Sequence, residues 1–414
     1  MFLRARVVLP MVQPPMEDGA IEIVGDRVHQ VSRWKELTRA EQRGALDLGE
    51  VIVLPGLINA HCHLDYTDMA GLLPVPKTFP DWIKSILVLK SHWSFSDYAR
   101  SWLNGARMLL ETGVTTVADI EAVPELLPEV WSATPLRIFS FLEMTGVRSR
   151  RPASAIVQEA AEKIQSLPHL FHRGGFSPHA PYSTTPELLA ASSSVARAQN
   201  LRLAMHVAES AAEFSMFMER RGPLFDWLKD QREVSDCGGV SPVQHLDRHG
   251  ILSDRFLAAH VNYLACGDAA LLANRGASVV HCPRSHVYFG HQEFPQAELE
   301  NAGVNVCLGT DSLASVRKVG KLPPALNLFL EMQTLATQSP QISAETILRM
   351  ATINGARALG LAGRVGELSA GAQADLLVLP YVGAAREATT AVVQHQGKVA
   401  AAMISGNWAF KNRT

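Results

Sequence analysis

Cysteine is scarce in this sequence, and the few cysteines do not lie in pairs. The chain has five, an odd number, and no C-x-x-C pair occurs among them. This usage argues against a disulfide framework and suits a reducing cytoplasm, which is the location we expect. It also excludes the cytidine-deaminase type of zinc site, because that site needs H-x-E followed by P-C-x-x-C. The cysteines are Cys62, Cys237, Cys266, Cys282 and Cys307.

Long hydrophobic runs are also missing. The longest uninterrupted apolar runs, such as Val51 to Ile58, are short, whereas a membrane-spanning helix needs about 20 apolar residues. The opening segment MFLRARVVLP carries Arg4 and Arg6 inside its apolar stretch, and no small-residue cleavage site follows it. We therefore expect neither a membrane protein nor a secretory signal peptide.

The chain has no excess of charge of either sign. Thirty-eight basic side chains stand against 40 acidic ones, for a net charge of −2, so we expect no nucleic-acid partner. Hydrophobic residues make up 47% and charged residues 19%, which excludes intrinsic disorder. The H-E-x-x-H, G-x-S-x-G, Walker and G-x-G-x-x-G motifs do not occur, which leaves little support for the enzyme classes they mark.

What the sequence does contain is a long alternation of short apolar runs with helical patterns such as Ser101 to Thr112 and Pro186 to Gln199. Such alternation predicts βα units and a parallel sheet. Eight runs in about 255 residues is the number that an α/β (β/α)8 barrel requires. The runs are 57–63, 115–120, 136–143, 174–179, 201–207, 256–261, 277–282 and 304–311.

The two ends of the chain have a different pattern. They consist of short β-branched runs separated by Gly, Asp and Pro, which is typical of small strands. We predict that residues 1–55 and 366–414 form one discontinuous β domain and that residues 56–365 form the barrel.

Metal-binding and acid–base side chains stand at the carboxyl ends of most of the predicted strands. In a (β/α)8 barrel these ends converge on one face, where the active site lies. Six of the eight predicted strands end in this way, the first of them in an H-x-H pair. The residues are His61, His63, His179, His206, His260, His281 and Asp311.

The H-x-H pair predicts a metal site. Residues i and i+2 of a strand point to the same side, so His61 and His63 can approach one ion. His206 and Asp311 would complete three nitrogens and one oxygen, which leaves a position for water, as in catalytic sites. The ion would lower the pKa of that water to about 7 and supply hydroxide at neutral pH.

Each of these residues also has an ordinary structural explanation. A single histidine at a strand end is more often hydrogen-bonded within the fold. Asp311 would suit a helix N-cap before SLASVRK, and Glu209 would suit the exposed start of a helix. Independent structural residues have no reason to mark the ends of so many strands, however, and the set as a whole favours metal binding.

Several segments of the sequence, taken together, resemble a known family. PGLINAHCHLD, HVAES, the strand ending in His260, HCPRSH and LGTDSLAS follow one another in the order found in the amidohydrolase superfamily, in its cytosine deaminase-like or chlorohydrolase-type branch. The resemblance implies a (β/α)8 barrel with a small β-sandwich built from both termini. It also implies one divalent ion, zinc or alternatively iron, held by His61, His63, His206 and Asp311. The fourth predicted strand has no lysine, which favours a mononuclear site.

The resemblance further implies a reaction, the hydrolytic deamination of an aminated N-heterocycle with release of ammonia. Asp311 would take a proton from the attacking water. Glu209, three residues after His206, would protonate the ring nitrogen next to the attacked carbon. His260 would stabilise the tetrahedral intermediate by hydrogen-bonding the attacking oxygen.

The resemblance points to several substrate contacts. His179 is similar to a substrate-contacting histidine of nucleoside-type members, and His281 would line the same face. Trp82 resembles an aromatic residue that covers the substrate, or it could be a core tryptophan. Arg148 could hold an anionic tail, or it could lie in a solvated loop. His286 stands where nucleoside-type relatives have Asn, which weakens a direct transfer of adenosine specificity.

The substrate is therefore expected to be a small molecule with a purine or nucleoside, pterin, pyrimidine or triazine ring. The rival functions are a chlorohydrolase or cyclic-amide hydrolase of the same superfamily and, from another class, a catalytically silent scaffold. The Glu209 spacing favours deamination, because opening a ring amide does not require that residue. Residues 210–250 are expected to form a lid or an oligomer contact, in which case the assembly could be a homodimer.

Overall fold

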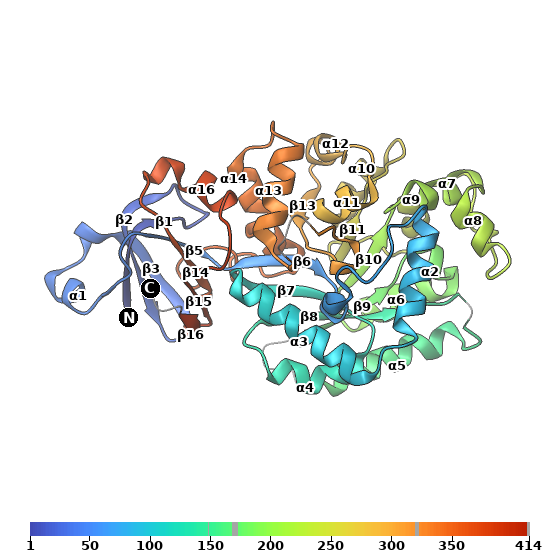
Figure 1. Ribbon diagram of the computed structural model, residues 1–414, viewed down its shortest axis with the longest axis horizontal. Helices are drawn as coiled ribbons and strands as arrows, with labels where there is room; N and C mark the ends of the chain where they lie inside the picture. The colour runs from blue at the N-terminus through green and yellow to red at the C-terminus, as the bar shows by residue number, and fades with distance from the viewer. Residues whose placement is uncertain (148, 168–172, 319–322, 412–414) are drawn as a thin grey trace.

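The computed structural model describes residues 1–147, 149–167, 173–318 and 323–411. These residues form a barrel of alternating strands and helices joined to a mixed sheet, which lies at the left of Figure 1 with both chain termini beside it. Among the described residues, no helix is both long and apolar enough to cross a membrane.

The barrel sheet contains eight parallel strands that pair in sequence order, from β6 through to β13. An isolated parallel bridge between Cys62 and Asp311 brings the last strand back beside the first, so the barrel is nearly closed. The predicted (β/α)8 fold is confirmed. The strands are β6 (Leu57–Cys62), β7 (Val114–Glu121), β8 (Arg137–Met144), β9 (Arg173–Pro178), β10 (Leu203–Val207), β11 (Phe256–His260), β12 (Ser278–His281) and β13 (Asn305–Leu308).

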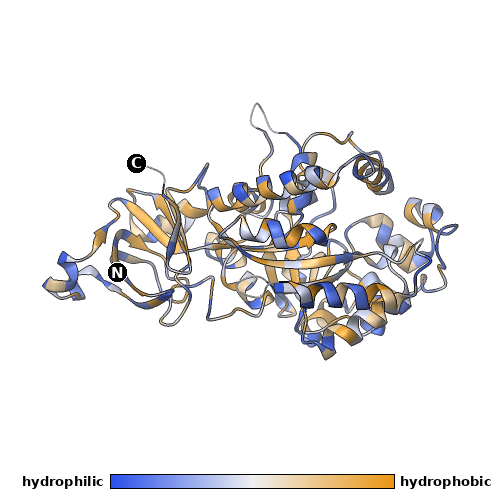
Figure 2. Cartoon of the chain, turned by 90° about the horizontal axis from the view of Figure 1, so that it is seen from below, coloured by the Kyte–Doolittle hydropathy of each residue, from blue (hydrophilic) through white to orange (hydrophobic). Residues whose placement is uncertain are grey.

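Helices cover the outside of the barrel (Figure 1). The strands are orange with hydrophobic residues, and the helices around them carry both blue and orange faces (Figure 2). This is the pattern that packs an amphipathic helix against a buried parallel sheet. The outer helices are α3 (Phe95–Glu111), α4 (Leu127–Ser132), α5 (Ala153–Ser166), α6 (Pro186–Ala198), α10 (Asp268–Arg275), α11 (Pro283–Phe289), α12 (Gln296–Asn301), α13 (Leu328–Gln338), α14 (Ala344–Met350) and α15 (Ile353–Ala358).

The second sheet is built from both ends of the chain, as predicted. Its central contact is the antiparallel pair of β5 and β14, in which Val53 lies opposite Val378. The strand order is β16-β15-β14-β5-β1-β2-β3, and the domain boundaries at residues 55 and 366 stay a prediction. The strands are β1 (Phe2–Val8), β2 (Met16–Val24), β3 (Arg27–Arg33), β4 (Leu46–Asp47), β5 (Val51–Pro55), β14 (Leu376–Pro380), β15 (Ala401–Ile404) and β16 (Asn407–Lys411). In the chain, α1 (Arg39–Arg43) comes between β3 and β4, and α16 (Ala388–Val393), between β14 and β15, packs against α13 and α14.

Two runs that look continuous in the sequence are hairpins in the structure. Residues 20–31 turn at Gly25 and residues 398–410 turn at Gly406, with φ angles of 61° and 76°. Glycine adopts this left-handed conformation without steric cost, and a Cβ on Gly406 would lie 2.3 Å from the carbonyl oxygen of Gly25. The two turns therefore pack against each other, which no single-strand pattern predicts.

Short helices cover the mouth of the barrel. Residues 210–250 form α7 (Ala211–Glu219), α8 (Pro223–Leu228) and α9 (Pro242–Arg248), and α2 (Phe79–Lys90) packs against α8. An apolar cluster that includes Phe79, Phe217 and Leu224 joins these helices. The 210–250 segment thus lies over the end of the barrel where the predicted metal ligands are found.

Candidate active site

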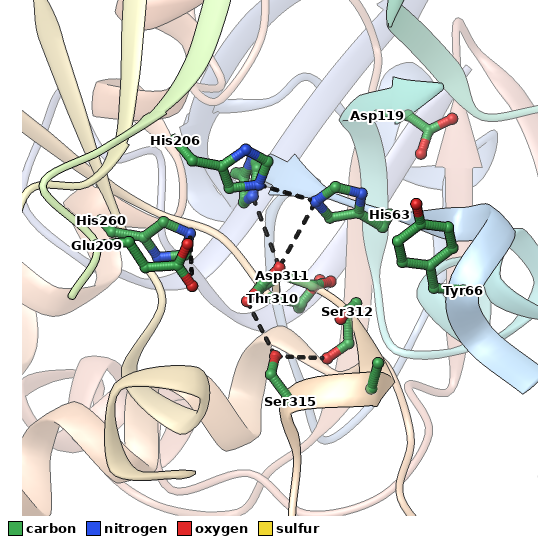
Figure 3. A network of polar contacts seen from close by, with 12 residues as sticks. His63, Tyr66, Asp119, His206, Glu209, His260, Thr310, Asp311, Ser312 and Ser315 are labelled. Carbon is green, nitrogen blue, oxygen red and sulfur yellow. Dashed lines mark hydrogen bonds and ion pairs between the residues drawn. The ribbon is translucent and has the colours of Figure 1, made fainter. Parts of the chain in front are cut away.

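The carboxyl ends of four barrel strands bring three imidazoles and a carboxylate together. Ligand atoms of His61, His206, His260 and Asp311 all lie within 4.8 Å of one another, and all four side chains are buried. Figure 3 shows His206 and His260 directed toward Asp311 from their separate strands. The predicted convergence of distant residues into a metal site is confirmed.

The backbone at these strand ends is turned into an uncommon conformation. His260, Val261, Asp311 and Ala208 all have positive φ angles, of 74°, 52°, 52° and 47°. Residues other than glycine rarely adopt such angles, least of all a β-branched residue, and strain of this kind is concentrated at functional sites. The bonds from Val261 N to Val207 O (2.9 Å) and from Asn262 N to Ala208 O (3.1 Å) hold the turn in place.

A β-bulge and two backbone bonds position His61. The pairing of β6 with β7 is irregular between Asn59 and Cys62, and bulges commonly re-aim side chains beside active sites. The carbonyl oxygen of His61 accepts hydrogen bonds from the backbone N–H groups of Thr310 (3.0 Å) and Asp311 (3.1 Å). The first strand is thereby fixed to the end of the last one.

His63, the other member of the H-x-H pair, lies at the same cluster. Its Nε2 is 3.1 Å from His206 Nε2 and 3.7 Å from Asp311 Oδ1, and His61 Nε2 is also 3.7 Å from that oxygen. Two nitrogens bound to one tetrahedral zinc ion would be about 3.3 Å apart. Five residues therefore surround the site: His61, His63, His206, His260 and Asp311. That His63, and not His260, is the third imidazole ligand stays a prediction.

The donor atoms of this cluster suit a divalent metal ion. Nε2 of His61 and Nε2 of His260 are buried and have no hydrogen-bond partner among the described residues. Nδ1 of His206 donates to the carbonyl oxygen of His179 (3.0 Å), so Nε2 presents its lone pair to the cluster. Imidazole nitrogens fixed by a second hydrogen bond, together with one carboxylate, are characteristic zinc ligands.

The electrostatics of the cluster favour the protonation states that a metal needs. Burial, with a contribution from neighbouring imidazoles, lowers the pKa of His63 and of His260 to about 3 and that of His206 well below its usual value. Burial alone would raise the pKa of Asp311, but the close approach of His61 (3.7 Å) and of the other adjacent imidazoles holds that pKa well below its usual range. Neutral imidazoles and an ionised carboxylate are the metal-binding forms.

Glu209 lies beside the cluster, and its pKa is shifted in the opposite direction from the pKa of Asp311. Burial, followed by the charges of Asp311 and Glu213, raises the pKa of Glu209 well above its usual value, which favours the protonated form of its carboxyl group. Its Oε1 is 3.8 Å from His260 Nε2. Glu213 accepts hydrogen bonds from the backbone N–H groups of Ala208 (3.1 Å) and Glu209 (2.9 Å), which anchors this turn.

A cavity of about 300 Å³ opens onto these residues. His63, His206, Glu209 and Asp311 line its inner end, and α2 and α8 supply apolar walls. Of the predicted substrate contacts, His179 and Trp82 line this cavity, and Trp82 Nε1 donates to the carbonyl oxygen of Ala314 (3.2 Å). The wall residues of the two helices are Trp82, Ile83, Ile86, Leu87, Trp227 and Leu228.

Two other predicted contacts lie outside the cavity. Val280 and Cys282 belong to the core inside the barrel, so the alternation of the strand turns His281 outward, where its ring stacks on Phe294 at 3.8 Å. His286, on α11, is buried and bonds through Nδ1 to Asn262 Oδ1 (3.0 Å). Neither residue lines the cavity. Arg148 falls outside the described residues.

The structure adds two charged residues that the sequence patterns did not identify. Glu143, at the end of β8, and Lys90, at the end of α2, both line the cavity. Lys90 Nζ lies 3.7 Å from Glu143 Oε2, His179 Nε2 lies 3.8 Å from Glu143 Oε1, and Lys90 donates to the hydroxyl of Tyr66 (2.5 Å). Glu143 stands at the end of a predicted strand, as the histidines do, so its position in the sequence could have identified it as a cavity residue. Lys90 lies in a helical pattern, and nothing in the sequence marks it as a cavity residue.

Both groups of this pair are charged. Burial acts to raise the pKa of Glu143, but the charges of Lys90 and His179 outweigh it and lower that pKa. Burial acts to lower the pKa of Lys90, and the charges of Glu143 and Asp65 outweigh it in turn. The cavity therefore has an ion pair on one wall, and beside the metal cluster it has Glu209, whose pKa is raised.

The barrel and its cluster define a metal-dependent hydrolase of the (β/α)8 class. The chain belongs to the amidohydrolase family, whose sequence profile matches residues 52–409. A 5-methylthioadenosine/S-adenosylhomocysteine deaminase from Syntrophobacter fumaroxidans is 32% identical over 387 residues, which is 88% of this chain and 80% of that protein. The predicted family and the predicted class of reaction, deamination by a metal-dependent amidohydrolase, are confirmed.

Solved structures share the complete architecture. The aminofutalosine deaminase of Helicobacter pylori, in complex with methylthio-coformycin, superposes with a TM-score of 0.86 at 20% identity and covers 98% of this chain and 99% of its own. An adenosine deaminase from Xanthomonas campestris with bound zinc gives a TM-score of 0.81 at 24% identity, covering 98% and 92%. These likenesses confirm the fold.

Proposed function

We propose that this enzyme deaminates the adenine ring of a nucleoside with a modified 5′ position and releases ammonia. The observation that carries the proposal is the position of Glu209, a buried carboxyl group that lines the cavity beside the metal cluster and whose pKa burial raises. The Syntrophobacter relative, named for two 5′-thio-substituted adenosines, supports this substrate class.

The metal ion would be held by His61, His63, His206 and Asp311, with zinc as the expected ion. His260 is the alternative fourth or fifth ligand. A divalent ion in this position acts as a Lewis acid and lowers the pKa of water to about 7. The zinc in the Xanthomonas structure supports this choice of metal over iron.

Three side chains would move or hold protons during the reaction. Asp311, ionised at the start, accepts a proton from the attacking water and later gives it to the amino group, which leaves as ammonia. Glu209 donates its proton to the ring nitrogen beside the attacked carbon, so that negative charge does not build up on the ring, and it recovers a proton from the added hydroxyl group as the carbonyl forms. His260 Nε2, 3.8 Å from Glu209 Oε1, hydrogen-bonds the oxygen that adds to the ring and stabilises the tetrahedral intermediate.

Glu143 and Lys90 would recognise the sugar. The groups facing the two carboxylate oxygens of Glu143 lie at 3.7 and 3.8 Å, beyond hydrogen-bond length, so both oxygens can accept hydroxyl donors from a ligand in the cavity. A vicinal diol supplies two such donors. The aromatic and aliphatic wall formed by α2 and α8 suits an apolar 5′ substituent. Together these features select a nucleoside over a free base.

Ammonia release from a panel of substrates tests the proposal. The panel contains 5′-methylthioadenosine, S-adenosylhomocysteine, 5′-deoxyadenosine, adenosine, aminofutalosine, adenine, a pterin and an aminotriazine, and atrazine is assayed for chloride release. We expect at least one 5′-modified nucleoside to exceed adenine in kcat/KM by 100-fold or more, which corresponds to about 2.7 kcal/mol. Preference for adenine, a pterin or a triazine would contradict the proposed substrate, and chloride release without ammonia would favour the chlorohydrolase alternative.

A further inference from the structure

A second cavity of about 300 Å³ lies at the opposite end of the barrel from the metal cluster. Phe139, near the start of β8, lines this cavity, whereas Glu143 on the same strand lines the first one. Four residues of extended strand separate the two positions by about 13 Å. The core inside the barrel, which includes Phe141 and Leu257, occupies the space between the strands.

Four arginines line this second cavity, which we name the arginine pocket. Arg173 begins β9, Arg202 directly precedes β10, Arg255 directly precedes β11, and Arg364 lies in the segment after α15. No carboxylate is found among the described residues that line it. Four cationic side chains in one pocket contrast with a chain whose net charge is −2.

Among the described residues, no carboxylate in the arginine pocket balances its positive charge. Burial, followed by the charge of Arg255 and a smaller contribution from Arg173, lowers the pKa of Arg202 to about 10. Asp254 acts in the other direction, but its side chain is exposed and does not line the pocket. An oxyanion in the pocket would supply the missing negative charge.

Two of the four guanidinium groups are held in position by the surrounding fold. Arg202 Nη1 donates to the carbonyl oxygen of Ala358 (2.8 Å), at the end of α15, and Arg255 Nη1 donates to the carbonyl oxygen of Asn200 (2.7 Å). Gly360 has a φ of +68°, and a Cβ there would lie 1.9 Å from Arg202 Nη2. Each guanidinium has five N–H donors. One bond to a backbone carbonyl oxygen therefore leaves further donors on Arg202 and on Arg255 for a ligand.

We propose that the arginine pocket binds a phosphate group, either as the free ion or as a phosphate monoester. Planar guanidinium forks match the oxygens of phosphate and bind them through paired, charge-assisted hydrogen bonds. A phosphate there would join the starts of β9, β10 and β11 to the segment after α15. Because the interior core separates this pocket from the metal cluster, the ligand would stabilise the barrel without entering the reaction.

Thermal unfolding of the intact enzyme tests the proposal. The Tm is measured in increasing inorganic phosphate against sodium chloride of equal ionic strength, for the wild type and for the double variant Arg173→Gln/Arg364→Gln. These two side chains are exposed, so the variant should fold. Arg39→Gln, which changes an exposed arginine on α1, is the matched control. We expect a saturable rise in Tm for the wild type and the control, and a midpoint at least tenfold weaker for the double variant.

An equal rise in all three proteins would overturn the proposal, because it would show a general salt effect. Absence of a rise in the wild type would overturn it as well. Arg202→Lys keeps the charge but removes the fork, and we expect it to weaken phosphate binding at least tenfold in a calorimetric titration; unchanged binding would contradict the pocket. Repeating the titration with glycerol 3-phosphate distinguishes free phosphate from a phosphate monoester as the ligand. If the pocket has room for the ester group, the monoester should bind with an affinity similar to that of the free ion; if it does not, only the free ion should bind.

Discussion

The two ends of the barrel carry opposite chemistry on the same strands. Arg202 precedes β10 and His206 lies near its carboxyl end, and Arg255 precedes β11, which ends in His260. One end has permanent positive charge and no carboxylate among its described lining residues. The other has imidazoles whose pKa burial lowers, to about 3 for His260, together with an ionised Asp311.

This difference shows how one scaffold separates two tasks. Imidazoles kept neutral by burial can give their lone pairs to a metal ion, whereas guanidinium groups can only donate hydrogen bonds and attract anions. The backbone differs as well. Non-glycine residues with positive φ angles aim side chains at the carboxyl end, whereas at the other end Gly360 makes room for Arg202. Changes at the carboxyl end should therefore affect the reaction, and changes at the amino end should affect stability.

Replacing Glu209 should have the largest effect. Glu209→Gln keeps the size of the side chain but removes the proton that the ring nitrogen receives, so kcat should fall by about 10²–10⁴-fold. Steady-state ammonia release measures this loss. Metal content and Tm should match those of the wild type, and a variant within tenfold of wild-type kcat would contradict the acid–base role.

Paired substitutions of His63 and His260 would separate the two candidate ligand sets. We expect His63→Gln to lower bound zinc to well under one ion per chain, because its Nε2 lies 3.1 Å from His206 Nε2. We expect His260→Gln to keep the metal but lose about 10²–10³-fold in kcat, as for a lost oxyanion-hole donor. Metal analysis of purified protein checks both, and the reverse metal contents would assign His260 as the ligand.

Substituting Glu143 should change substrate binding more than turnover. Glu143→Gln removes one charged acceptor from the cavity wall, so KM for nucleosides should rise by about tenfold, equivalent to about 1.4 kcal/mol, with little change in kcat. A 2′,3′-dideoxynucleoside serves as the control, because it lacks the hydroxyl groups and should lose nothing. Equal losses for the two substrates would contradict the contact with the sugar.

The smallest predicted effect concerns His245, a buried residue of α9 whose ring packs on Phe217. Burial, followed by the charges of His249 and Arg232, lowers the pKa of His245 to about 3. The unfolded imidazole takes up a proton below about pH 6.5, whereas the folded one stays neutral, so acidification from pH 7 to pH 5 favours the unfolded state. His245→Gln should remove about 1–2 kcal/mol of this loss.

Denaturant unfolding of both proteins at pH 7 and pH 5 measures that difference. Any release of metal at pH 5 is common to the two proteins and cancels in the comparison. An identical pH dependence in the variant would show that His245 does not remain neutral in the folded state.

The alternation of apolar runs was enough to predict the barrel, because buried parallel strands need continuous apolar segments whatever their partners. The metal cluster was also predictable, since the carboxyl ends of barrel strands share one face. The sequence alone did not show that His260 lies as close to the other ligand atoms of the cluster as the predicted metal ligands do. Its position depends on the positive φ angles at His260 and Val261, which no propensity favours.

Other features could not be predicted, because they depend on the direction of a side chain or on how distant segments pack together. His281 ends a strand like the other histidines, but the pleat turns it outward because Val280 and Cys282 face the core. Lys90 enters the cavity because α2 packs over the barrel mouth. The arginine pocket joins residues more than 190 positions apart, from Arg173 to Arg364, and none of them belongs to a recognisable motif.

We propose above that residues from separate strands surround a single divalent ion at the carboxyl end of the barrel, and each proposed catalytic role depends on that ion. Anomalous diffraction from crystals of the purified enzyme, measured on both sides of the zinc absorption edge, tests this proposal most directly. We expect one peak, about 2.0–2.2 Å from imidazole nitrogens of the cluster and from an oxygen of Asp311. Absence of a peak there, a second peak of equal height beside it, or a peak elsewhere in the chain would contradict a single ion at this site.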